Sequence, residues 1–271
     1  MRHSNIHTHT NFSDGKNTAE EMVQKALELG FVSLGFSAHS PMAAPDDSWS
    51  LRDEEGYIRE IRALAEEYKD RIEIYCGIEW DLTSEIDRSQ YDYAIGSVHM
   101  LENEHGRWAM DLSLEELMSC INDGFGGDPY AMCEAYYNDM VENVLRDGVD
   151  VVGHFDVLTK YNGDGIAFDE NHPRYLTAAR SALDAICTAR PDIIFECNVG
   201  GMIRAGRPEP YPPLWALKEL KARGMRITLT SDAHKAENLT EGFDRGIEFL
   251  RAAGYESVYI LKDEGFVKYE I

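Results

Sequence analysis

The sequence has few cysteines, and their placement argues against two kinds of stabilising site. The five cysteines are scattered along the chain and form no Cys-x-x-Cys pair. An odd number of thiols without such spacing disfavours both a thiolate zinc site and a disulfide framework. We therefore expect reduced cysteines, most of them in a hydrophobic core.

Long hydrophobic runs are also missing. No stretch of about 18 apolar residues is present, which is the length needed to span a bilayer as a helix. The N-terminus does not show the basic-then-apolar layout of a signal peptide. These features predict a soluble cytoplasmic protein with no membrane partner.

Positive charge is scarce. The chain has 26 Lys and Arg against 49 Asp and Glu, a formal net charge of −23 at pH 7. Phosphate backbones need clustered Lys and Arg, so we expect no nucleic-acid partner. A small anionic substrate remains possible if bound metal ions reverse the local field.

Strand-like and helix-like segments alternate along the 271 residues, and a hydrophobic content of 44% can supply a large core. Seven strands are predicted, at residues 5–9, 32–37, 71–78, 93–98, 149–153, 193–198 and 226–230. Helices are predicted at residues 19–29, 53–68, 113–122, 129–146, 173–189, 213–223 and 241–252, the first with a capping box from Thr18 and Glu21. Residues 41–51 and 102–108 are expected to be loops, and a short strand near residues 257–261 ends the pattern.

This alternation favours an α/β barrel of one domain over residues 1–271. The chain shows no internal repeat and no linker-like segment. Polar residues follow the C-terminal ends of nearly all predicted strands, which is where a β/α barrel builds its active site. An open doubly wound sheet is the alternative, but it would gather these residues at one switch point.

Histidines and carboxylates dominate these strand ends. His7 and His9 lie two residues apart, so they point to one face of the first strand. The full set of candidate metal ligands is His7, His9, Asp14, His39, Glu79, His99, His154, Asp232 and His234. Nine ligands exceed the needs of one ion, so we expect two or three divalent ions, with Glu79 as a bridge. Nitrogen and oxygen donors without thiolates suit zinc, manganese or iron.

The order and spacing of these residues resemble the motifs of the PHP (polymerase and histidinol phosphatase) superfamily. The matching segments run from residue 5 to about residue 235: His7-Thr8-His9, Asp14, Ala38-His39-Ser40-Pro41, Gly77-Ile78-Glu79, Ser97-Val98-His99, Gly153-His154-Phe155-Asp156, Glu196-Cys197-Asn198 and Ser231-Asp232-Ala233-His234. The resemblance implies a distorted (β/α)7 TIM-like barrel with a trinuclear metal site. It also implies three ligand groups: His7, His9, Glu79 and Asp232; Glu79, His99 and His154; and Asp14, His39 and His234. Many members have histidine at the position of Asp14, so a carboxylate there would make the third site harder and more anionic.

Cations after the predicted strand ends are candidates for binding a phosphate. Lys160, Arg204 and Arg207 all lie in such segments, and arginine offers a planar fork of donors for phosphate oxygens. His105, in the loop after the His99 strand, is a further candidate substrate contact. The loop over residues 200–213 resembles the histidinol-phosphatase branch of the superfamily.

These features lead to the hypothesis of a metal-dependent phosphomonoesterase that converts L-histidinol phosphate to L-histidinol and phosphate in histidine biosynthesis. A hydroxide bridging two metal ions would attack phosphorus, while Arg204 and Lys160 neutralise the phosphate oxygens. The leaving oxygen would be protonated by Asp232, His234 or a metal-bound water. The alternatives are a related phosphoesterase for a nucleotide, sugar phosphate or phosphoprotein, a metallohydrolase of another bond, and a non-catalytic metal-binding regulator.

Overall fold

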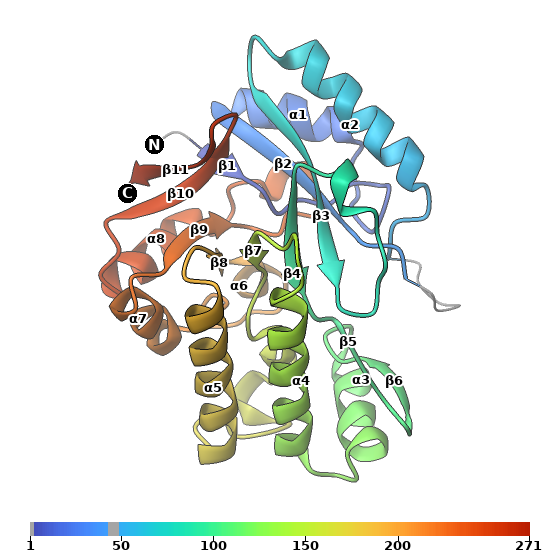
Figure 1. Ribbon diagram of the computed structural model, residues 1–271, viewed down its shortest axis with the longest axis vertical. Coiled ribbons are helices and arrows are strands. Elements are labelled where there is room, and N and C mark those ends of the chain that lie inside the picture. The colour runs from blue at the N-terminus through green and yellow to red at the C-terminus, as the bar shows by residue number, and fades with distance from the viewer. Residues whose placement is uncertain (1–2, 43–48) are drawn as a thin grey trace.

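A curved parallel sheet of seven strands forms the centre of the molecule (Figure 1). The computed structural model describes residues 3–42 and 49–271, so part of the loop expected at residues 41–51 lies outside the described residues. In spatial order, the strands are β1 (His3–Asn5), β2 (Phe31–His39), β3 (Glu73–Asp81), β4 (Tyr93–Ser97), β7 (Val151–Val152), β8 (Ile194–Asn198) and β9 (Arg226–Thr230). All neighbouring pairs are parallel, as a barrel of β/α units requires.

The two ends of this sheet meet just beyond β1 and β9. Thr8 forms a parallel bridge with Ala233. The backbone N–H of His9 donates to the carbonyl oxygen of Ala233 at 2.8 Å, and the N–H of Ala233 donates to the carbonyl oxygen of His7 at 3.1 Å. The sheet therefore curves into the nearly closed, distorted barrel that was expected.

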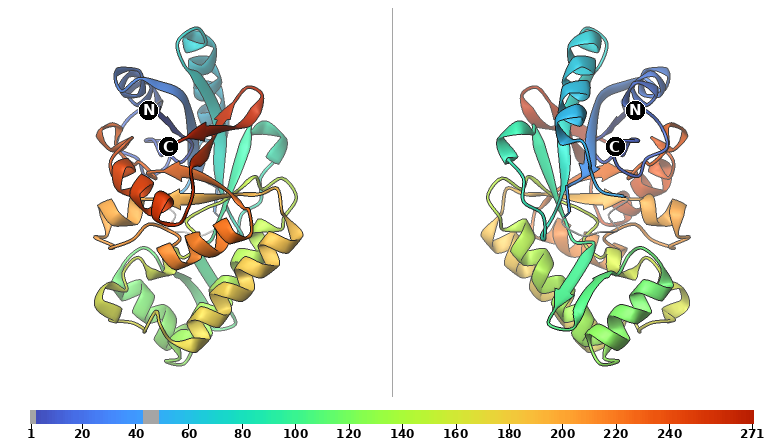
Figure 2. Two further views of the ribbon diagram at one scale, coloured as in Figure 1. Left: turned by 90° about the vertical axis from the view of Figure 1, so that its left-hand side faces the viewer. Right: turned by 90° about the vertical axis from the view of Figure 1, so that its right-hand side faces the viewer.

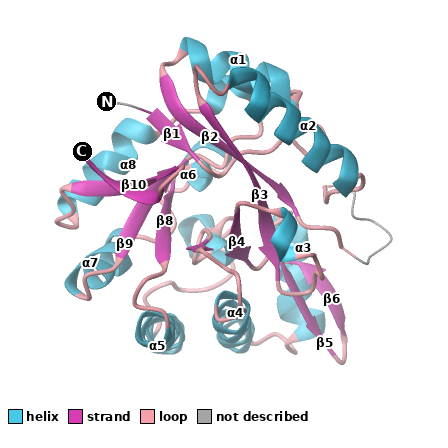
Figure 3. Cartoon of the chain, turned by 45° about the horizontal axis from the view of Figure 1, so that its top comes forward, coloured by secondary structure: helices cyan, strands magenta, loops and turns pink. Residues whose placement is uncertain are grey.

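Helices cover the outside of this barrel, with α1 and α2 over the strands β1 to β3 and α4, α5, α7 and α8 around the remaining strands (Figure 3). Their bounds are α1 Ala19–Glu28, α2 Glu54–Tyr68, α3 Leu114–Ser119, α4 Pro129–Val144, α5 Pro173–Ala189, α6 Gly200–Arg204, α7 Leu214–Ala222 and α8 Phe243–Ala252. The predicted capping box begins α1: the Glu21 N–H donates to Thr18 Oγ1 at 3.2 Å, and the Thr18 N–H donates to Glu21 Oε2 at 2.9 Å. No helix in the described ranges is long and apolar enough to cross a membrane.

The inner face of the barrel is filled by a small apolar cluster below the strand ends. Its centre is Tyr93 on β4, whose hydroxyl lies 2.5 Å from the carbonyl oxygen of Ile6 and 3.0 Å from that of Phe36. Gly35 and Gly77 on the neighbouring strands leave the space for the Tyr93 ring, because a Cβ at either position would overlap it. The same inner-face alternation continues upward from Gly77 to Glu79, and so directs a carboxylate to the open end of the barrel.

Two antiparallel hairpins lie outside the barrel pattern, and neither was fully predicted. The expected loop at residues 102–108 is part of a hairpin formed by β5 (Met100–Asn103) and β6 (Gly106–Ala109). The terminal strand β10 (Ser257–Lys262) pairs with a second strand, β11 (Gly265–Glu270), which sequence reasoning missed. This second hairpin packs β10 against β1, β2 and β9 (Figure 2).

Short helical turns connect the larger elements. They are the 3-10 turns at Arg88–Gln90, Val157–Thr159, Gly163–Gly165 and Ala236–Asn238, and a π-helical turn at Cys120–Gly124 that extends α3. The helix expected at residues 113–122 is therefore an α-helix for its first half and a wider turn for its second. The short helix α6 lies within the segment that was expected to be a loop.

Candidate metal centre

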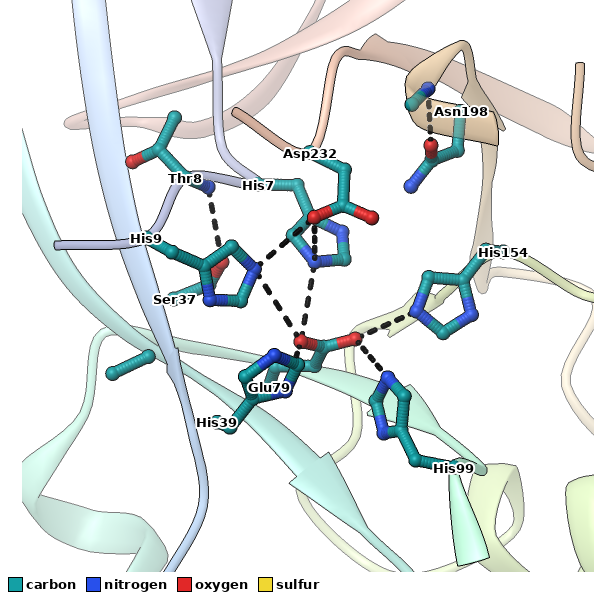
Figure 4. Close-up of polar contacts among 12 residues, drawn as sticks. His7, Thr8, His9, Ser37, His39, Glu79, His99, His154, Asn198 and Asp232 are labelled. Carbon is teal, nitrogen blue, oxygen red and sulfur yellow. Dashed lines mark hydrogen bonds and ion pairs between the residues drawn. The ribbon is translucent and has the colours of Figure 1, made fainter. Parts of the chain in front are cut away.

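Glu79, near the end of β3, lies at the centre of the histidine cluster (Figure 4). Its side chain is fully buried. Five imidazole rings approach its two oxygens with N···O distances between 2.7 and 3.5 Å, from His7, His9, His39, His99 and His154. Burial opposes ionisation, but the positive potential of His7, His39 and His99 holds the pKa of the Glu79 carboxyl well below its usual range.

Asp232 adds a second carboxylate to this cluster from the segment after β9. Its Oδ1 lies 3.2 Å from Nε2 of His9 and 3.6 Å from Nε2 of His7. The Asp232 backbone has a φ of 51°, an unusual left-handed conformation for a residue other than glycine. Such strain is frequent at functional sites, where the surrounding structure compensates its cost.

A third group lies at the cavity side of His9. Asp14 Oδ2 is 2.9 Å from Nε2 of His234, and Asp14 Oδ1 is 3.7 Å from Nε2 of His39. Burial, together with the charges of His234 and His39, lowers the pKa of His9 to about 3, which keeps its imidazole neutral. A neutral imidazole is the form that ligates a metal ion.

Several buried donor atoms in this cluster have no hydrogen-bond partner, which is the observation expected of a metal site. They are Nε2 of His7, both ring nitrogens of His9, Nδ1 of His39, Nδ1 of His99, Nδ1 of His154, Oδ1 of Asp14 and Oε2 of Glu79. Buried polar atoms in folded proteins are normally satisfied, so this concentration of unpaired nitrogens and oxygens points to a bound ligand. The donor set, imidazole and carboxylate without thiolate, fits divalent ions such as zinc.

The geometry groups these atoms in four overlapping sets, each with its ligand atoms within 4.8 Å of one another. The sets are His9, Asp14, His39 and His234; His7, His9 and Glu79; His7, His154 and Asp232; and His39, Glu79 and His99. All nine residues singled out in the sequence therefore come together at one end of the barrel. The sets differ in detail from the expected grouping, since His7, His9 and His39 each belong to two of them.

Two carboxylates that support this cluster were not recognised as site residues in the sequence. Glu196 Oε1 lies 2.7 Å from Nδ1 of His7, and its Oε2 accepts the backbone N–H of His154 at 2.9 Å. Asp81 Oδ2 accepts the backbone N–H of His99 at 2.8 Å. Such partners fix the orientation of ligating histidines. The available signal for Glu196 was its place two residues after Ile194 on the inner face of a buried strand.

A cavity of about 520 Å³ opens beside the cluster. Six of the nine residues line it, namely Asp14, His39, His99, His154, Asp232 and His234. Trp49 packs edge-on against His39 with 4.8 Å between ring centroids. The cavity therefore joins the candidate metal centre to space in which a small molecule can bind.

Two of the cations predicted to contact a phosphate line this cavity. Arg204 donates from Nη2 to Asp232 Oδ2 at 2.6 Å and from Nη1 to the Asp232 carbonyl oxygen at 2.7 Å. Lys160 pairs with Asp111 Oδ2 at 3.2 Å. Asp111 is a further cavity residue that sequence reasoning missed.

The other two predicted substrate contacts do not line the cavity. His105 lies in the turn of the β5–β6 hairpin with its side chain 59% exposed, and its ring is 3.6 Å from Glu104. Arg207 donates to Glu170 Oε2 at 2.8 Å. The hairpin carries His105 away from His99, and the Glu170 carboxylate engages Arg207, so the structure does not support either contact.

Comparison with known proteins defines the class. The PHP domain family matches residues 5–198, and the chain belongs to this family. It is 29% identical over 253 residues to the "Probable histidinol-phosphatase" of Deinococcus radiodurans, with 89% of each chain covered. It is 26% identical over 275 residues to the "Histidinol-phosphatase" of Bacillus subtilis, covering 92% of this chain and 99% of that protein. These relatives confirm the predicted family and its histidinol-phosphatase branch.

Two solved structures share the fold. That of hisK from Listeria monocytogenes superposes with a TM-score of 0.77 at 22% identity, covering 90% of this chain and 99% of that one. The histidinol phosphate phosphatase of Lactococcus lactis, solved in complex with Zn, L-histidinol and phosphate, has a TM-score of 0.66 at 22% identity, with 98% of each chain covered. At this level of identity the likeness confirms the barrel architecture.

Proposed function

We propose that this protein is a metal-dependent phosphomonoesterase that hydrolyses L-histidinol phosphate to L-histidinol and phosphate. The observation that carries the proposal is the ring of unpaired histidine nitrogens around Glu79, beside a cavity that also presents Arg204 and Lys160. The histidinol-phosphatase relatives support the choice of substrate. So does the Lactococcus lactis structure, which contains Zn, L-histidinol and phosphate.

Two or three divalent ions would be held by the nine histidine and carboxylate residues, with Glu79 shared between them. Zinc is the ion that the Lactococcus lactis structure supports, and manganese and iron fit the same donors. When bound, such ions act as Lewis acids toward phosphoryl oxygens and lower the pKa of water. Glu196 would keep the ring of His7 in an orientation suited to ligation, and Asp81 would hold the backbone of His99 in place.

The cavity residues would bind the phosphate and control the proton. Arg204 and Lys160 would neutralise phosphate oxygens and orient the ester. Burial opposes the ionisation of Asp232, but Arg204 and His7 hold the pKa of its carboxyl well below its usual range, so Asp232 stays ionised. An ionised Asp232 cannot supply a proton, so the proton for the leaving alkoxide would come from His234 or from water.

We also propose that residues 1–271 form one phosphoesterase domain, which acts in the cytoplasm and catalyses a step of histidine biosynthesis. The sheet order supports this domain assignment, because β1 from the start of the chain and the segment after β9 meet to close one barrel. The free cysteines fit a reducing compartment.

The test is phosphate release from L-histidinol phosphate by protein supplied with zinc, manganese or iron, beside a panel of nucleotide, sugar and protein phosphates. We expect preference for L-histidinol phosphate, with kcat/KM at least about 100-fold above the other esters. Rapid hydrolysis of another ester would support phosphoesterase activity but reject L-histidinol phosphate as the substrate. No phosphate release from any ester would reject both the activity and the substrate.

A variant connects this activity to the candidate metal centre. His99→Ala should lower kcat by at least about 1000-fold, because it removes one Glu79 partner from the cluster. His105→Ala, at the exposed hairpin turn, is the matched control and should keep wild-type kcat. Circular dichroism would check that both variants fold, and near-normal turnover by His99→Ala would contradict the metal centre.

A further inference from the structure

Asp111 is a carboxylate that lines the cavity without belonging to any of the metal-ligand sets. The other two aspartates of the cavity wall, Asp14 and Asp232, both belong to those sets. Asp111 follows β6 and precedes α3, so it is supplied by the hairpin that interrupts the regular β/α pattern between β4 and β7. A phosphate-binding cavity gains nothing from an additional negative charge, so the position of Asp111 needs a separate explanation.

The contacts of Asp111 leave part of its carboxylate available to a ligand. Its side chain is 13% exposed, and in the described part of the chain its hydrogen bonding is limited to the one from Lys160 Nζ to Oδ2, at 3.2 Å. Oδ1 makes no hydrogen bond within the described residues, and it is not one of the buried atoms without a partner, so it is accessible. One oxygen of the carboxylate is therefore engaged by Lys160, and the other can accept from a molecule in the cavity.

The cavity wall thus carries groups of both signs. Arg204 and Lys160 would attract a phosphate, while Asp111 offers a negative group that would repel phosphate and attract a cation. Lys160 also donates to Asp111. A ligand that complements groups of both signs carries a phosphate and a positively charged nitrogen a short distance apart.

We propose that Asp111 binds the primary ammonium group of the substrate and selects aminoalkyl phosphates over phosphate esters without an amine. The inference rests on the proposed phosphomonoesterase function and defines its substrate class. In L-histidinol phosphate the ammonium is attached to the carbon next to the ester methylene, so one molecule presents both charges. A charged hydrogen bond between carboxylate and ammonium is stronger than one between neutral groups, and loses its value when the amine is absent.

The experiment compares wild type with Asp111→Asn on esters that differ in the amine alone. One pair is L-histidinol phosphate and its deamino analogue, 3-(imidazol-4-yl)propyl phosphate; the other is O-phosphoethanolamine and ethyl phosphate. We expect Asp111→Asn to lower kcat/KM for the amine-bearing ester of each pair by about 10–100-fold. The esters without an amine should change by less than about 3-fold, because they never contact the carboxylate.

Controls separate recognition of the amine from an effect on Lys160. Lys160→Met should weaken both members of a pair to a similar extent, since it removes a phosphate contact. Metal content and melting temperature of Asp111→Asn should equal those of wild type. An equal loss by Asp111→Asn on esters with and without the amine would overturn the proposal and show that Asp111 acts by positioning Lys160.

A binding measurement tests the ammonium site independently of which ester is the substrate. Titration calorimetry of zinc-loaded protein with L-histidinol and with 3-(imidazol-4-yl)propanol should show tighter binding of the amine, and Asp111→Asn should abolish the difference. If L-histidinol phosphate is a poor substrate but O-phosphoethanolamine shows an Asp111-dependent preference, the ammonium site stands and the substrate fails. If wild type binds both alcohols equally, the ammonium site is rejected whatever ester is hydrolysed.

Discussion

The site depends on some residues that do not themselves line the cavity, among them Glu79 and His7. His7 is fully buried behind the cavity wall, and its Nδ1 is held by Glu196 while its Nε2 faces Glu79. The contact of Nδ1 with Glu196 therefore determines that Nε2 is the nitrogen of His7 presented to a metal ion.

Glu196→Gln should weaken metal binding while the protein stays folded. An amide oxygen can still accept from His7 Nδ1, but it lacks the charge that makes the ring a better donor, so we expect metal affinity to fall by about 10–100-fold. Competition with a chromophoric chelator would measure the change. Glu209→Gln is the control, because this carboxylate accepts from the Leu214 N–H and does not contact the cluster. Equal affinity in wild type and Glu196→Gln would contradict the role assigned to Glu196.

The metal-ligand candidates could be predicted from the sequence because nearly all of them lie at or just beyond a strand end, where a barrel exposes its functional groups. Glu196 and Asp111 were harder to find. Glu196 is inside β8 rather than after it, and Asp111 belongs to a segment without regular periodicity. The pairing of Arg207 with Glu170 could not be foreseen, because the two residues are 37 positions apart in the sequence.

At the scale of elements, the packing of β4 beside β3 depends on a glycine in β3. A Cβ at Gly77 would overlap the ring of Tyr93 on the neighbouring strand. We expect Gly77→Ala to lower the free energy of unfolding by about 1–3 kcal/mol, because the barrel interior cannot make room for the added methyl group.

Urea unfolding would measure this effect of overpacking. Gly163→Ala is the matched control, since a Cβ there meets no atom within 4 Å. A loss of stability as large in Gly163→Ala as in Gly77→Ala would show that the cost does not come from contact with Tyr93.

The helix α4 contains a carboxyl group whose ionisation opposes folding. Burial, with the nearby charges of Glu142 and Asp81, raises the pKa of Asp139 to about 6, against an ordinary value of 3.8. The folded state therefore binds the proton more tightly than the unfolded chain does. The contribution of the protonated Asp139 carboxyl to stability is fully present below pH 3.8 and is lost as the pH rises through about 6.

Asp139→Asn should consequently stabilise the protein at pH 8 and have little effect at pH 3.5. The gain at pH 8 should be about 1–2 kcal/mol, since partial exposure of this side chain to solvent reduces the effect of its pKa shift. Urea unfolding of both proteins at the two pH values measures the difference. A gain that is the same at both values would show that ionisation of Asp139 is not its cause.

Most elements of the barrel could be predicted because parallel strands are buried on both faces and give continuous apolar runs. The segment β9 was predicted with its observed bounds, Arg226–Thr230. Of the two hairpins, the strand β10 was predicted near residues 257–261, but β5, β6 and β11 were missed. Their strands have a mixed composition, so their pairing depends on contacts with the barrel rather than on local pattern. The strand β7 is reduced to Val151–Val152 because the chain turns at once into the site.

At the scale of the whole molecule, the candidate ligands come from nearly every strand of the sheet, so bound metal should stabilise the entire barrel. We expect added zinc at about 100 times its dissociation constant to raise the free energy of unfolding by about 2.7 kcal/mol. For a chain of this size the melting temperature should rise by about 5–10 °C. Differential scanning calorimetry with chelator and with zinc would measure it.

Matched variants show whether this response comes from the cluster. His9→Ala removes a residue of two ligand sets and should lose most of the zinc-dependent rise in melting temperature. His105→Ala changes an exposed histidine outside those sets and should keep it. An undiminished rise in His9→Ala would place the stabilising zinc elsewhere.

The bridge between Thr8 and Ala233 also sets an order for events during synthesis on the ribosome. His7 and His9 are made more than two hundred residues before the segment around Ala233 that pairs with theirs. At roughly 5–20 residues per second, the N-terminal segment waits for tens of seconds before its partner emerges. We therefore expect the metallated state only in chains translated beyond Ala233, so a nascent chain stopped near residue 225 should retain no zinc after gel filtration.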